Sequence, residues 1–278
     1  MKCKSKSLDK LIRKKFGVIK ELGHGGQGKV YLVKTLLDNK EYALKLIDKT
    51  SEESFKRFRK EVTSLKSIKS NYVIKIISEN ITDKDNENYY VMELARYGTL
   101  QDHNYYINDV ETSLKLFKKI CLGVKAAHDK GILHRDLKPK NILLVNDERD
   151  VKVSDFGLSY ELDKTDEEIT KIREKVGTNY FSSPEQTSLP PNPTKRSDIF
   201  SLGKILFYMI TGNKSADFDE KLSIDSFVNH KYSDKIDVLI NKMSSFEPKN
   251  RYEDIDEVIK AIDKLLIKPK YFRFFLRG

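Results

Sequence analysis

The chain has 278 residues and a formal net charge of +10, and 38% of its residues are hydrophobic, which is enough to build a core. This length suits one large two-lobed domain or two small domains. No apolar run approaches the roughly eighteen residues of a membrane span, and we expect no secretory signal because the N-terminus lacks an apolar stretch. The two cysteines, Cys3 and Cys121, lie far apart, which disfavours a disulfide framework or a zinc site and indicates a reducing, cytoplasmic location.

The first fifteen residues form the one densely basic segment of the chain. We interpret residues 1–15 as a solvated, partly disordered basic extension, with weak contact to an acidic partner or an anionic lipid surface as the alternative. Lysines elsewhere are scattered through every predicted element, so the net charge does not indicate a specific nucleic-acid interface.

A glycine-rich loop follows, with the pattern G-x-G-x-x-G-x-V from Gly23 to Val30. Dinucleotide-binding folds share this glycine spacing, but there the glycines open a helix. Here Val18 and Ile19 precede the loop and the β-branched and aromatic residues 30–33 follow it, which predicts a strand, a glycine turn and a strand. Glycines let backbone N–H groups approach phosphates, so we prefer a phosphate-binding hairpin to a plain turn. Its predicted nucleotide-binding residues are Leu22, Gly23, Gly25, Gly26, Gly28 and Val30.

A lysine lies inside the short apolar strand that we predict for residues 42–47. Burying this residue, Lys45, is costly without an anionic partner. Glu61 adjoins the apolar face of a helix predicted over residues 52–69, in which hydrophobic side chains recur at intervals of three and four. We therefore predict that Lys45 pairs with Glu61, in preference to the alternative that Glu61 is a solvated helix charge.

Two more strands are predicted at residues 71–77 and 88–94, on either side of a polar turn. Beyond residue 95 the pattern changes to helices with few strands, beginning with a helix over residues 112–130 that Gly131 ends. Strands followed by helices are typical of an α+β fold, here in two lobes.

The segment Leu133–Asn141 carries the densest set of chemical groups in the chain. Asp136 can orient an attacking hydroxyl and accept its proton, whereas Asp155 and Asn141 can hold Mg²⁺ or Mn²⁺ against a triphosphate. Two short strands are predicted between the amide and the second carboxylate, at residues 142–144 and 151–153.

In this order, the glycine loop, the strand lysine, the helix glutamate and the two catalytic segments resemble the protein kinase family, over about residues 16–267. The resemblance implies a two-lobed kinase fold of the α+β class. It divides a domain at residues 16–268 into an N-lobe (16–94), with an antiparallel sheet and one helix, and a mainly helical C-lobe (95–268). A basic, aromatic tail follows at residues 269–278.

The resemblance also implies roles for single residues. Lys45, paired with Glu61, contacts the α- and β-phosphates of ATP. Lys138 neutralises the transferring phosphoryl group and is typical of kinases that act on serine or threonine. Met92 is the gatekeeper behind the adenine, and the hinge that binds adenine through its backbone follows it. The implied adenine site comprises Ala43, Met92, Glu93, Leu94, Ala95 and Leu143.

Control is expected in the segment 155–185. Arg135 adjoins the catalytic Asp136, and family members with this arginine are commonly controlled by phosphorylation of that segment. Thr165 and Thr170 are the best sites, because they lie mid-segment among charged residues.

Residues 177–185 resemble the loop that docks protein substrates. Its last residue, Glu185, is implied to pair with Arg251 and anchor the C-lobe. Asp198, which we place at the start of a helix, is implied to brace the backbone of the catalytic loop.

Three features depart from the family pattern. Gln27 stands where an aromatic residue often covers the phosphates, and residues 213–232 are short and polar, so the usual docking helix is expected to be reduced. The tail at 269–278 is expected to pack on the C-lobe, with contact to a membrane surface as the alternative.

We therefore expect an ATP- and Mg²⁺-dependent serine/threonine protein kinase that acts on protein hydroxyls. One alternative is a pseudokinase-type binding module, and another is a small-molecule phosphotransferase of kinase-like fold. The docking loop disfavours the second. The first is disfavoured by the presence of all five groups that transfer requires: Lys45, Glu61, Asp136, Asn141 and Asp155.

Overall fold

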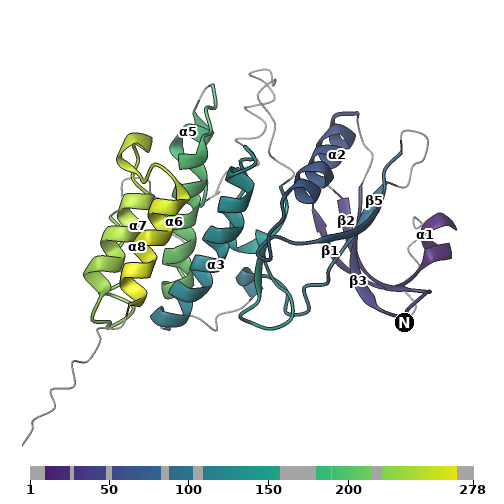
Figure 1. Ribbon diagram of the computed structural model, residues 1–278, viewed down its shortest axis with the longest axis horizontal. Helices are drawn as coiled ribbons and strands as arrows, with labels where there is room; N and C mark the ends of the chain where they lie inside the picture. The colour runs from purple at the N-terminus through teal and green to yellow at the C-terminus, as the bar shows by residue number, and fades with distance from the viewer. Residues whose placement is uncertain are drawn as a thin grey trace, which may run out of the picture.

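The computed structural model describes residues 10–25, 28–47, 52–82, 88–102, 109–156, 180–188, 190–213 and 221–267. They form two lobes that lie side by side, one built on a sheet and the other on helices (Figure 1). The α+β, two-lobed fold predicted from the sequence is confirmed. Some predicted features lie outside the described residues: Gly26, Gln27, Thr165, Thr170 and the tail at 269–278.

The N-lobe is a five-stranded antiparallel sheet in the order β1-β2-β3-β5-β4. Its strands are β1 (Phe16–Gly25), β2 (Gly28–Thr35), β3 (Glu41–Leu46), β4 (Ile76–Asn80) and β5 (Tyr89–Met92). The predicted order of three strands, a helix and two strands is confirmed. β4 begins at Ile76 rather than at residue 71, because residues 72–74 hydrogen-bond to β7 (Val151–Val153) of the other lobe instead of to the sheet.

Two helices cover opposite faces of this sheet (Figure 1). Helix α2 (Glu52–Ser67) buries the predicted apolar stripe, including Phe55, Phe58 and Val62, against the face that looks toward the C-lobe. Helix α1 (Lys10–Lys15) lies against the outer face. Alternation along β3 separates the two faces, because successive side chains of a strand point to opposite sides.

Helix α1 was not predicted from the sequence. Its Ile12 is fully buried in the outer cluster with Phe16, Tyr31 and Leu44. This part of the basic extension therefore packs on the sheet and is not wholly solvated. Two adjacent apolar residues, Leu11 and Ile12, among basic residues give no helical periodicity, so the burial of Ile12 depends on tertiary contact.

The C-lobe carries a two-stranded sheet and a set of packed helices. The pairing of β6 (Ile142–Leu144) with β7 has the predicted bounds. Helix α6 begins three residues before Asp198, because Thr194 caps its N-terminus together with Ser197. The helices described are α3 (Val110–His128), α5 (Pro184–Thr187), α6 (Lys195–Thr211), α7 (Ser233–Met243) and α8 (Ile255–Leu266), with short 3-10 turns at Leu100–Asp102, Pro139–Asn141 and Pro248–Asn250.

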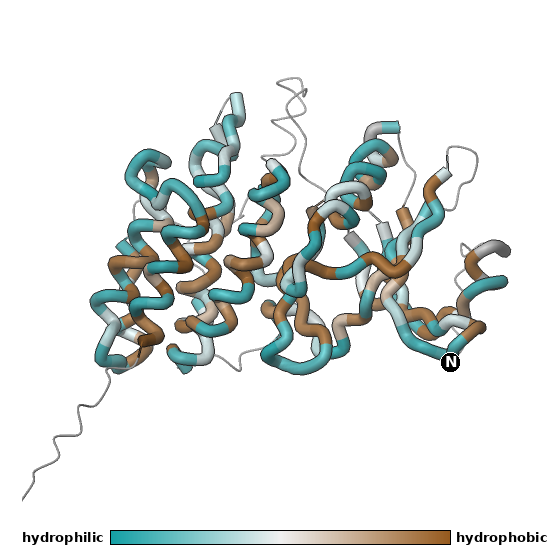
Figure 2. Tube along the Cα trace, in the orientation of Figure 1, coloured by the Kyte–Doolittle hydropathy of each residue, from teal (hydrophilic) through white to brown (hydrophobic). Residues whose placement is uncertain are grey.

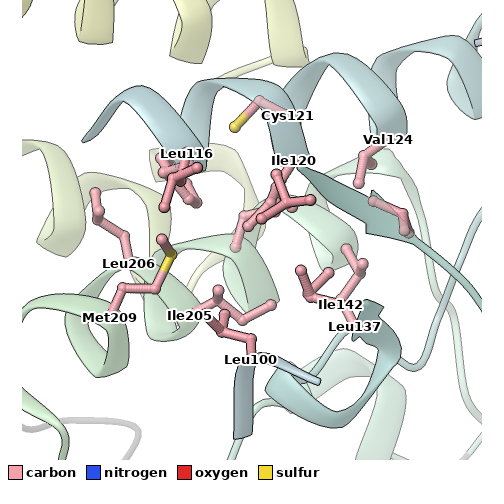
Figure 3. Close-up of a cluster of buried hydrophobic side chains, with 14 of the residues drawn as sticks. Leu100, Leu116, Ile120, Cys121, Val124, Leu137, Ile142, Ile205, Leu206 and Met209 are labelled. Carbon is pink, nitrogen blue, oxygen red and sulfur yellow. The ribbon is translucent and has the colours of Figure 1, made fainter. Parts of the chain in front are cut away.

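Hydrophobic residues line the inner sides of the helices and polar residues their outer sides (Figure 2). Figure 3 shows how this core holds the central loop of the C-lobe: Leu137 and Ile142 project into a cluster formed by α3 and α6. Both side chains are at most 1% exposed. The loop that carries the predicted catalytic residues is thus anchored at two apolar points, on either side of Lys138 and Asn141.

Three smaller observations complete the fold. Cys121 is fully buried in α3, where burial raises the pKa of its thiol, as expected of a small core residue. Residues 221–232 form turns held by side chains of α7 and no helix, in keeping with the expected reduction of the docking helix. Among the described residues, no helix is both long enough and apolar enough to cross a membrane.

Candidate active site

The carboxylate of Asp136 is the centre of the candidate site. It lies in the loop between α3 and β6 and is 8% exposed. Lys138 Nζ contacts its two oxygens at 2.9 and 2.7 Å. Asn141 Nδ2 donates to the same carboxylate at 3.0 Å and to the Asp136 backbone oxygen at 2.8 Å. The carboxylate therefore has a fixed direction, which a group that orients a hydroxyl requires.

The Asp198 carboxylate holds the backbone of the loop that carries Asp136. Its carboxylate accepts the N–H groups of His134 and Arg135 at 2.9 and 2.8 Å and contacts His128 Nε2 at 2.7 Å. Burial alone would raise the pKa of Asp198, but these hydrogen bonds outweigh it and hold the pKa below its usual value. The predicted brace is confirmed, and it fixes Arg135 at a φ of 66°, which a non-glycine residue rarely adopts.

His134 connects the catalytic loop to the segment that follows β7. Its Nε2 lies 2.9 Å from the Ser154 backbone oxygen, and its ring lies 4.6 Å from that of Phe156. Ser154 in turn bonds back to the Asn141 backbone oxygen. Asp155, which lies between Ser154 and Phe156 in the chain, has a φ of 63°. The strained backbone of Asp155 is thus held in place by the contacts that its two neighbours, Ser154 and Phe156, make with the catalytic loop.

Lys45 forms the predicted pair with Glu61, at 2.7 and 3.0 Å, and both side chains are at most 9% exposed. It also contacts Asp155 at 3.2 Å, which joins the two lobes. Burial would lower the pKa of Lys45, but Glu61, Tyr90 and Asp155 outweigh it and hold the pKa well above its usual value. Burial raises the pKa of Glu61 although Lys45 opposes this.

Tyr90 is a site residue that the sequence analysis missed. It is the cross-strand partner of Lys45, and its hydroxyl donates to Glu61 at 2.7 Å. A tyrosine within an otherwise apolar strand was the available signal, because a buried hydroxyl needs a hydrogen-bond partner.

The glycine loop is a hairpin between β1 and β2, as predicted. Gly23 pairs with Val30 and Gly25 with Gly28. A Cβ at Gly28, whose φ is +133°, would lie 2.1 Å from the Leu46 backbone oxygen, so only glycine fits.

Five of the apolar residues predicted to bind the nucleotide come together, whereas Leu22 and Ala95 do not join them. Val30, Ala43, Met92, Leu94 and Leu143 belong to one cluster that spans the two lobes. Leu22 does not join it; this side chain is 44% exposed on β1.

The hinge segment, residues 93–95, is anchored on both sides. The Glu93 N–H donates to the Lys75 oxygen at 3.1 Å, and the N–H groups of Arg96 and Tyr97 donate to Val145 and Leu144 at 3.1 Å each. In the part of the chain that the structure describes, the Ala95 N–H makes no backbone hydrogen bond. The same holds for the Leu94 N–H, so two backbone donors of the hinge segment are available to a ligand.

Asn141 and Asp155 fit a magnesium ion. Both side-chain hydrogen bonds of Asn141 use its nitrogen, which leaves its amide oxygen, and Lys45 helps to keep the pKa of Asp155 below its usual value despite burial. Oxygen ligands from one or two protein groups, completed by phosphates, are what Mg²⁺ prefers. Within the described ranges no three His, Cys, Asp or Glu side chains gather as a metal site.

The end of the docking loop is tied to the C-lobe. Arg251 pairs with Glu185 at 2.7 and 2.9 Å, as predicted. Gln186, which the sequence analysis missed, donates to the Arg135 backbone oxygen at 2.7 Å and so links this loop to the catalytic loop. The remaining part of the segment, residues 157–179, lies outside the described residues.

Comparison with known proteins agrees with this geometry. The family model described as "Protein kinase domain" matches residues 16–274. The interferon-induced, double-stranded RNA-activated protein kinase of Rattus norvegicus is 32% identical over 281 residues, which cover 92% of this chain and 53% of the relative. Serine/threonine-protein kinase PrkC of Bacillus subtilis is 28% identical over 270 residues, which cover 90% of this chain and 40% of the relative. The chain thus spans about half or less of these relatives.

A solved structure shares the fold. The kinase domain of Mycobacterium tuberculosis PknI superposes with a TM-score of 0.65 at 17% identity, covering 90% of this chain and 95% of that domain. Together with the family match over most of the sequence, these findings show that the chain belongs to the protein kinase family.

Proposed function

We propose that this chain is an ATP-dependent serine/threonine protein kinase that transfers the γ-phosphoryl group of ATP to protein hydroxyls, with Mg²⁺ (or Mn²⁺) as the metal. The observation that carries the proposal is the contact of Lys45 with Asp155, at 3.2 Å. It sets the phosphate-binding cation of one lobe against the metal-binding carboxylate of the other, where a triphosphate and its metal have to meet.

In this proposal Asp136 orients the substrate hydroxyl and takes its proton. The hydroxyl oxygen bonds to the γ-phosphorus as the bond to the bridging oxygen breaks, and ADP leaves. Lys138, which contacts both oxygens of Asp136, lies beside the transferring group and offsets its negative charge. A bound magnesium ion supplies further neutralisation of phosphate charge, and Asn141 and Asp155 are the residues proposed to hold it.

The nucleotide is proposed to lie between the lobes. Its phosphates lie under the glycine hairpin, where N–H groups of residues 23–28 approach them, and against Lys45. Its adenine lies among the apolar cluster and against the hinge, where the Ala95 N–H is the proposed donor to the base.

The substrate class rests on the position of Lys138 and on the names of the relatives, several of which are serine/threonine-protein kinases. We also propose that the chain acts in the cytoplasm. Its few, widely spaced cysteines support this, together with the buried thiol of Cys121.

We further propose control by phosphorylation of Thr165 or Thr170. The support is a positive region near the catalytic loop: burial and then the nearby Arg135 lower the pKa of Lys60 on α2. A phosphate in the segment after Asp155 is the kind of group that such a region binds. Mass spectrometry after incubation with Mg·ATP should find phosphate at one of the two threonines. Full activity in an unphosphorylated Thr165→Ala/Thr170→Ala variant would exclude this control.

The main test of the proposed function is the substitution Asp136→Asn. It keeps the shape of the side chain and removes the group that accepts the proton, so transfer from Mg·ATP to a generic protein substrate should fall by roughly 10²–10⁴-fold. Radiolabelled ATP followed by phosphoamino-acid analysis measures both the rate and the acceptor residue. The matched control is Asp147→Asn, which removes an exposed carboxylate from the β6–β7 turn.

The outcomes separate the alternatives. Phosphoserine or phosphothreonine in the wild type and in the Asp147→Asn control, and loss in the Asp136→Asn variant, support the proposal. ATP binding with no transfer by the wild type would indicate a binding module instead. Wild-type transfer by a folded Asp136→Asn protein would refute the assignment of the base.

A further inference from the structure

Glu93, the first residue of the hinge, is held by its side chain as well as by its backbone. Its carboxylate oxygens accept from Lys152 Nζ at 2.8 Å each. One of them also accepts the backbone N–H of Lys75 at 2.8 Å. Because the Glu93 N–H donates back to the Lys75 oxygen, this residue is tied to two separate segments at once.

Lys152 comes from the strand that leads to the metal-binding carboxylate. It lies on β7, three residues before Asp155, and its cross-strand partner is Leu143 on β6. Partners across an antiparallel pair project from the same face of a sheet. The Lys152 side chain therefore projects from the same face as Leu143, a residue of the predicted adenine site, and its ammonium group contacts Glu93 of the hinge.

The surroundings of this pair are closely packed. The Val153 N–H donates to the Tyr72 oxygen at 2.8 Å, and the Ile74 N–H donates to the Val153 oxygen at 2.9 Å. Behind them, a Cβ added at Gly123 on α3 would lie 2.5 Å from the Tyr72 oxygen and 3.0 Å from the Val153 side chain. The strand that carries Lys152 is thus fixed to both lobes and to α3, so it is a rigid base for the ion pair.

The pair differs from the surface ion pairs of this protein. The side chains of Lys152 and Glu93 are 14% and 21% exposed, whereas those of Lys115 and Glu111, an exposed helix pair, are 58% and 49% exposed. Exposed pairs contribute little, because water screens them and mobile side chains lose entropy. A pair that is more shielded and makes two bonds to one carboxylate fixes direction more strongly.

We infer that Lys152 is a positioning residue for adenine recognition, acting through Glu93. The inference rests on the proposed function, since it assumes that the hinge backbone binds the base. Lys152 on β7 holds one end of residues 93–95, and the N–H groups of Arg96 and Tyr97, which donate to Val145 and Leu144 at the end of β6, hold the other. The hinge donors and acceptors are thereby held in one register relative to Leu143, so they match adenine rather than another base.

The experiment compares Lys152→Met with two matched variants of the full chain. Lys152→Arg keeps a cation at the same place. Lys75→Met removes a neighbouring exposed lysine that reaches Glu93 only through its backbone N–H, which the substitution retains. For each protein the measurements are KM for ATP, kcat at saturating ATP, the dissociation constants of Mg·ATP and Mg·GTP by calorimetry, and Tm.

We expect Lys152→Met to raise KM and the dissociation constant for ATP about tenfold, the effect of losing one charge-assisted hydrogen-bonded contact. The preference for ATP over GTP should fall by a similar factor, while kcat stays within about twofold because no group at the phosphates is changed. Lys152→Arg and Lys75→Met should behave like the wild type. A merely structural role would lower Tm without changing the preference between the two bases.

Three results would overturn the inference: an unchanged preference for ATP in Lys152→Met, an equal effect of Lys75→Met, or a loss confined to kcat. If Lys152→Met does not fold, Glu93→Gln tests the same pair from the hinge side, because it retains an acceptor for Lys75 and removes the charge that pairs with Lys152. If the wild type binds ATP without transferring phosphate, the proposed function fails and the dissociation constants still decide the inference. If the wild type binds no ATP, both fail.

Discussion

The two lobes hold their halves of the proposed site by different means. In the N-lobe, Lys45 is fixed by side-chain charge, since the Glu61 carboxylate lies 2.7 Å away on a separate helix. In the C-lobe, the catalytic loop is fixed through its backbone, since the N–H groups of His134 and Arg135 both donate to Asp198. Both carboxylates are fully buried, yet their pKa values shift in opposite directions.

This difference follows from what surrounds each carboxylate. Asp198 receives three hydrogen-bonding groups, which outweigh the effect of burial, whereas for Glu61 burial outweighs the single ammonium group and the Tyr90 hydroxyl.

The two kinds of contact also differ in what breaks them. A contact between one strand and one helix, such as that of Lys45 with Glu61, is lost when the helix moves. Backbone hydrogen bonds into a buried carboxylate are lost only when the loop unfolds. We therefore expect the N-lobe half to be adjustable and the C-lobe half to be permanent.

The largest effect on stability should come from Asp198→Asn. The amide that replaces one carboxylate oxygen is a donor and would face the N–H of His134 or Arg135, so at least one buried donor loses its acceptor. We expect the free energy of unfolding to fall by about 3–5 kcal/mol, the usual cost of breaking a buried charged network. Denaturant unfolding measures this loss, and activity should fall with it because Arg135 is no longer held at positive φ.

Asp234→Asn is the matched control for that substitution. Both aspartates lie in the first turn of a helix, so their interactions with the helix dipole are similar, but Asp234 is exposed. A loss of stability as small as that of the control would show that Asp198 does not brace the loop. The binding of ATP, measured by the rise in Tm, should survive in the Asp198→Asn variant, because the partners of Asp198 (His128 and the N–H groups of His134 and Arg135) are not among the groups proposed to bind the nucleotide.

Lys45→Met should have the opposite effects from Asp198→Asn: a smaller loss of stability and a loss of ATP binding. Methionine fills much of the same space, and the Glu61 carboxyl keeps the Tyr90 hydroxyl as a partner, so we expect a smaller loss of about 1–3 kcal/mol. The rise in Tm that Mg·ATP produces should be nearly abolished, because the cation proposed to contact the phosphates is gone. Lys34→Met, at an exposed lysine of the same sheet, should leave both quantities unchanged. A normal ATP effect in Lys45→Met would remove Lys45 from the proposed site.

Much of this site was predictable because its residues break local rules. A lysine within an apolar strand and a glutamate beside an apolar helix face indicated a buried pair, and Lys45 and Glu61 form it. The bounds of β6 and β7 were predictable as well, since short apolar strands separated by a polar turn leave few alternatives.

The contacts that join segments distant in sequence were not predictable from local patterns. His128 looked like a residue near the end of an amphipathic helix, and only the crossing of α3 and α6 sets it 2.7 Å from Asp198. The bond from Gln186 to Arg135 likewise depends on how the docking loop folds back. Helix α1 was missed because its Ile12, which is fully buried, owes its burial to the sheet and not to its neighbours in sequence.

The smallest effect, and the most direct test of the contrast between the lobes, is the pH dependence of stability. The pKa of Asp198 is lower in the folded chain than in the unfolded chain, so its contribution is present above the usual pKa of an aspartate and is lost as the pH falls through the folded value. The pKa of Glu61 is higher in the folded chain, so its contribution is present below the usual pKa of a glutamate and is lost as the pH rises through the folded value. Urea unfolding of the wild type, Asp198→Asn and Glu61→Gln between about pH 7 and about pH 2 compares the two, because this window reaches below the usual pKa of an aspartate. As the pH falls, the advantage of the wild type over Asp198→Asn should shrink, whereas its stability relative to Glu61→Gln should rise. Slopes of the same sign would mean that both carboxylates are held in the same way, and the distinction between an adjustable and a permanent half would be wrong.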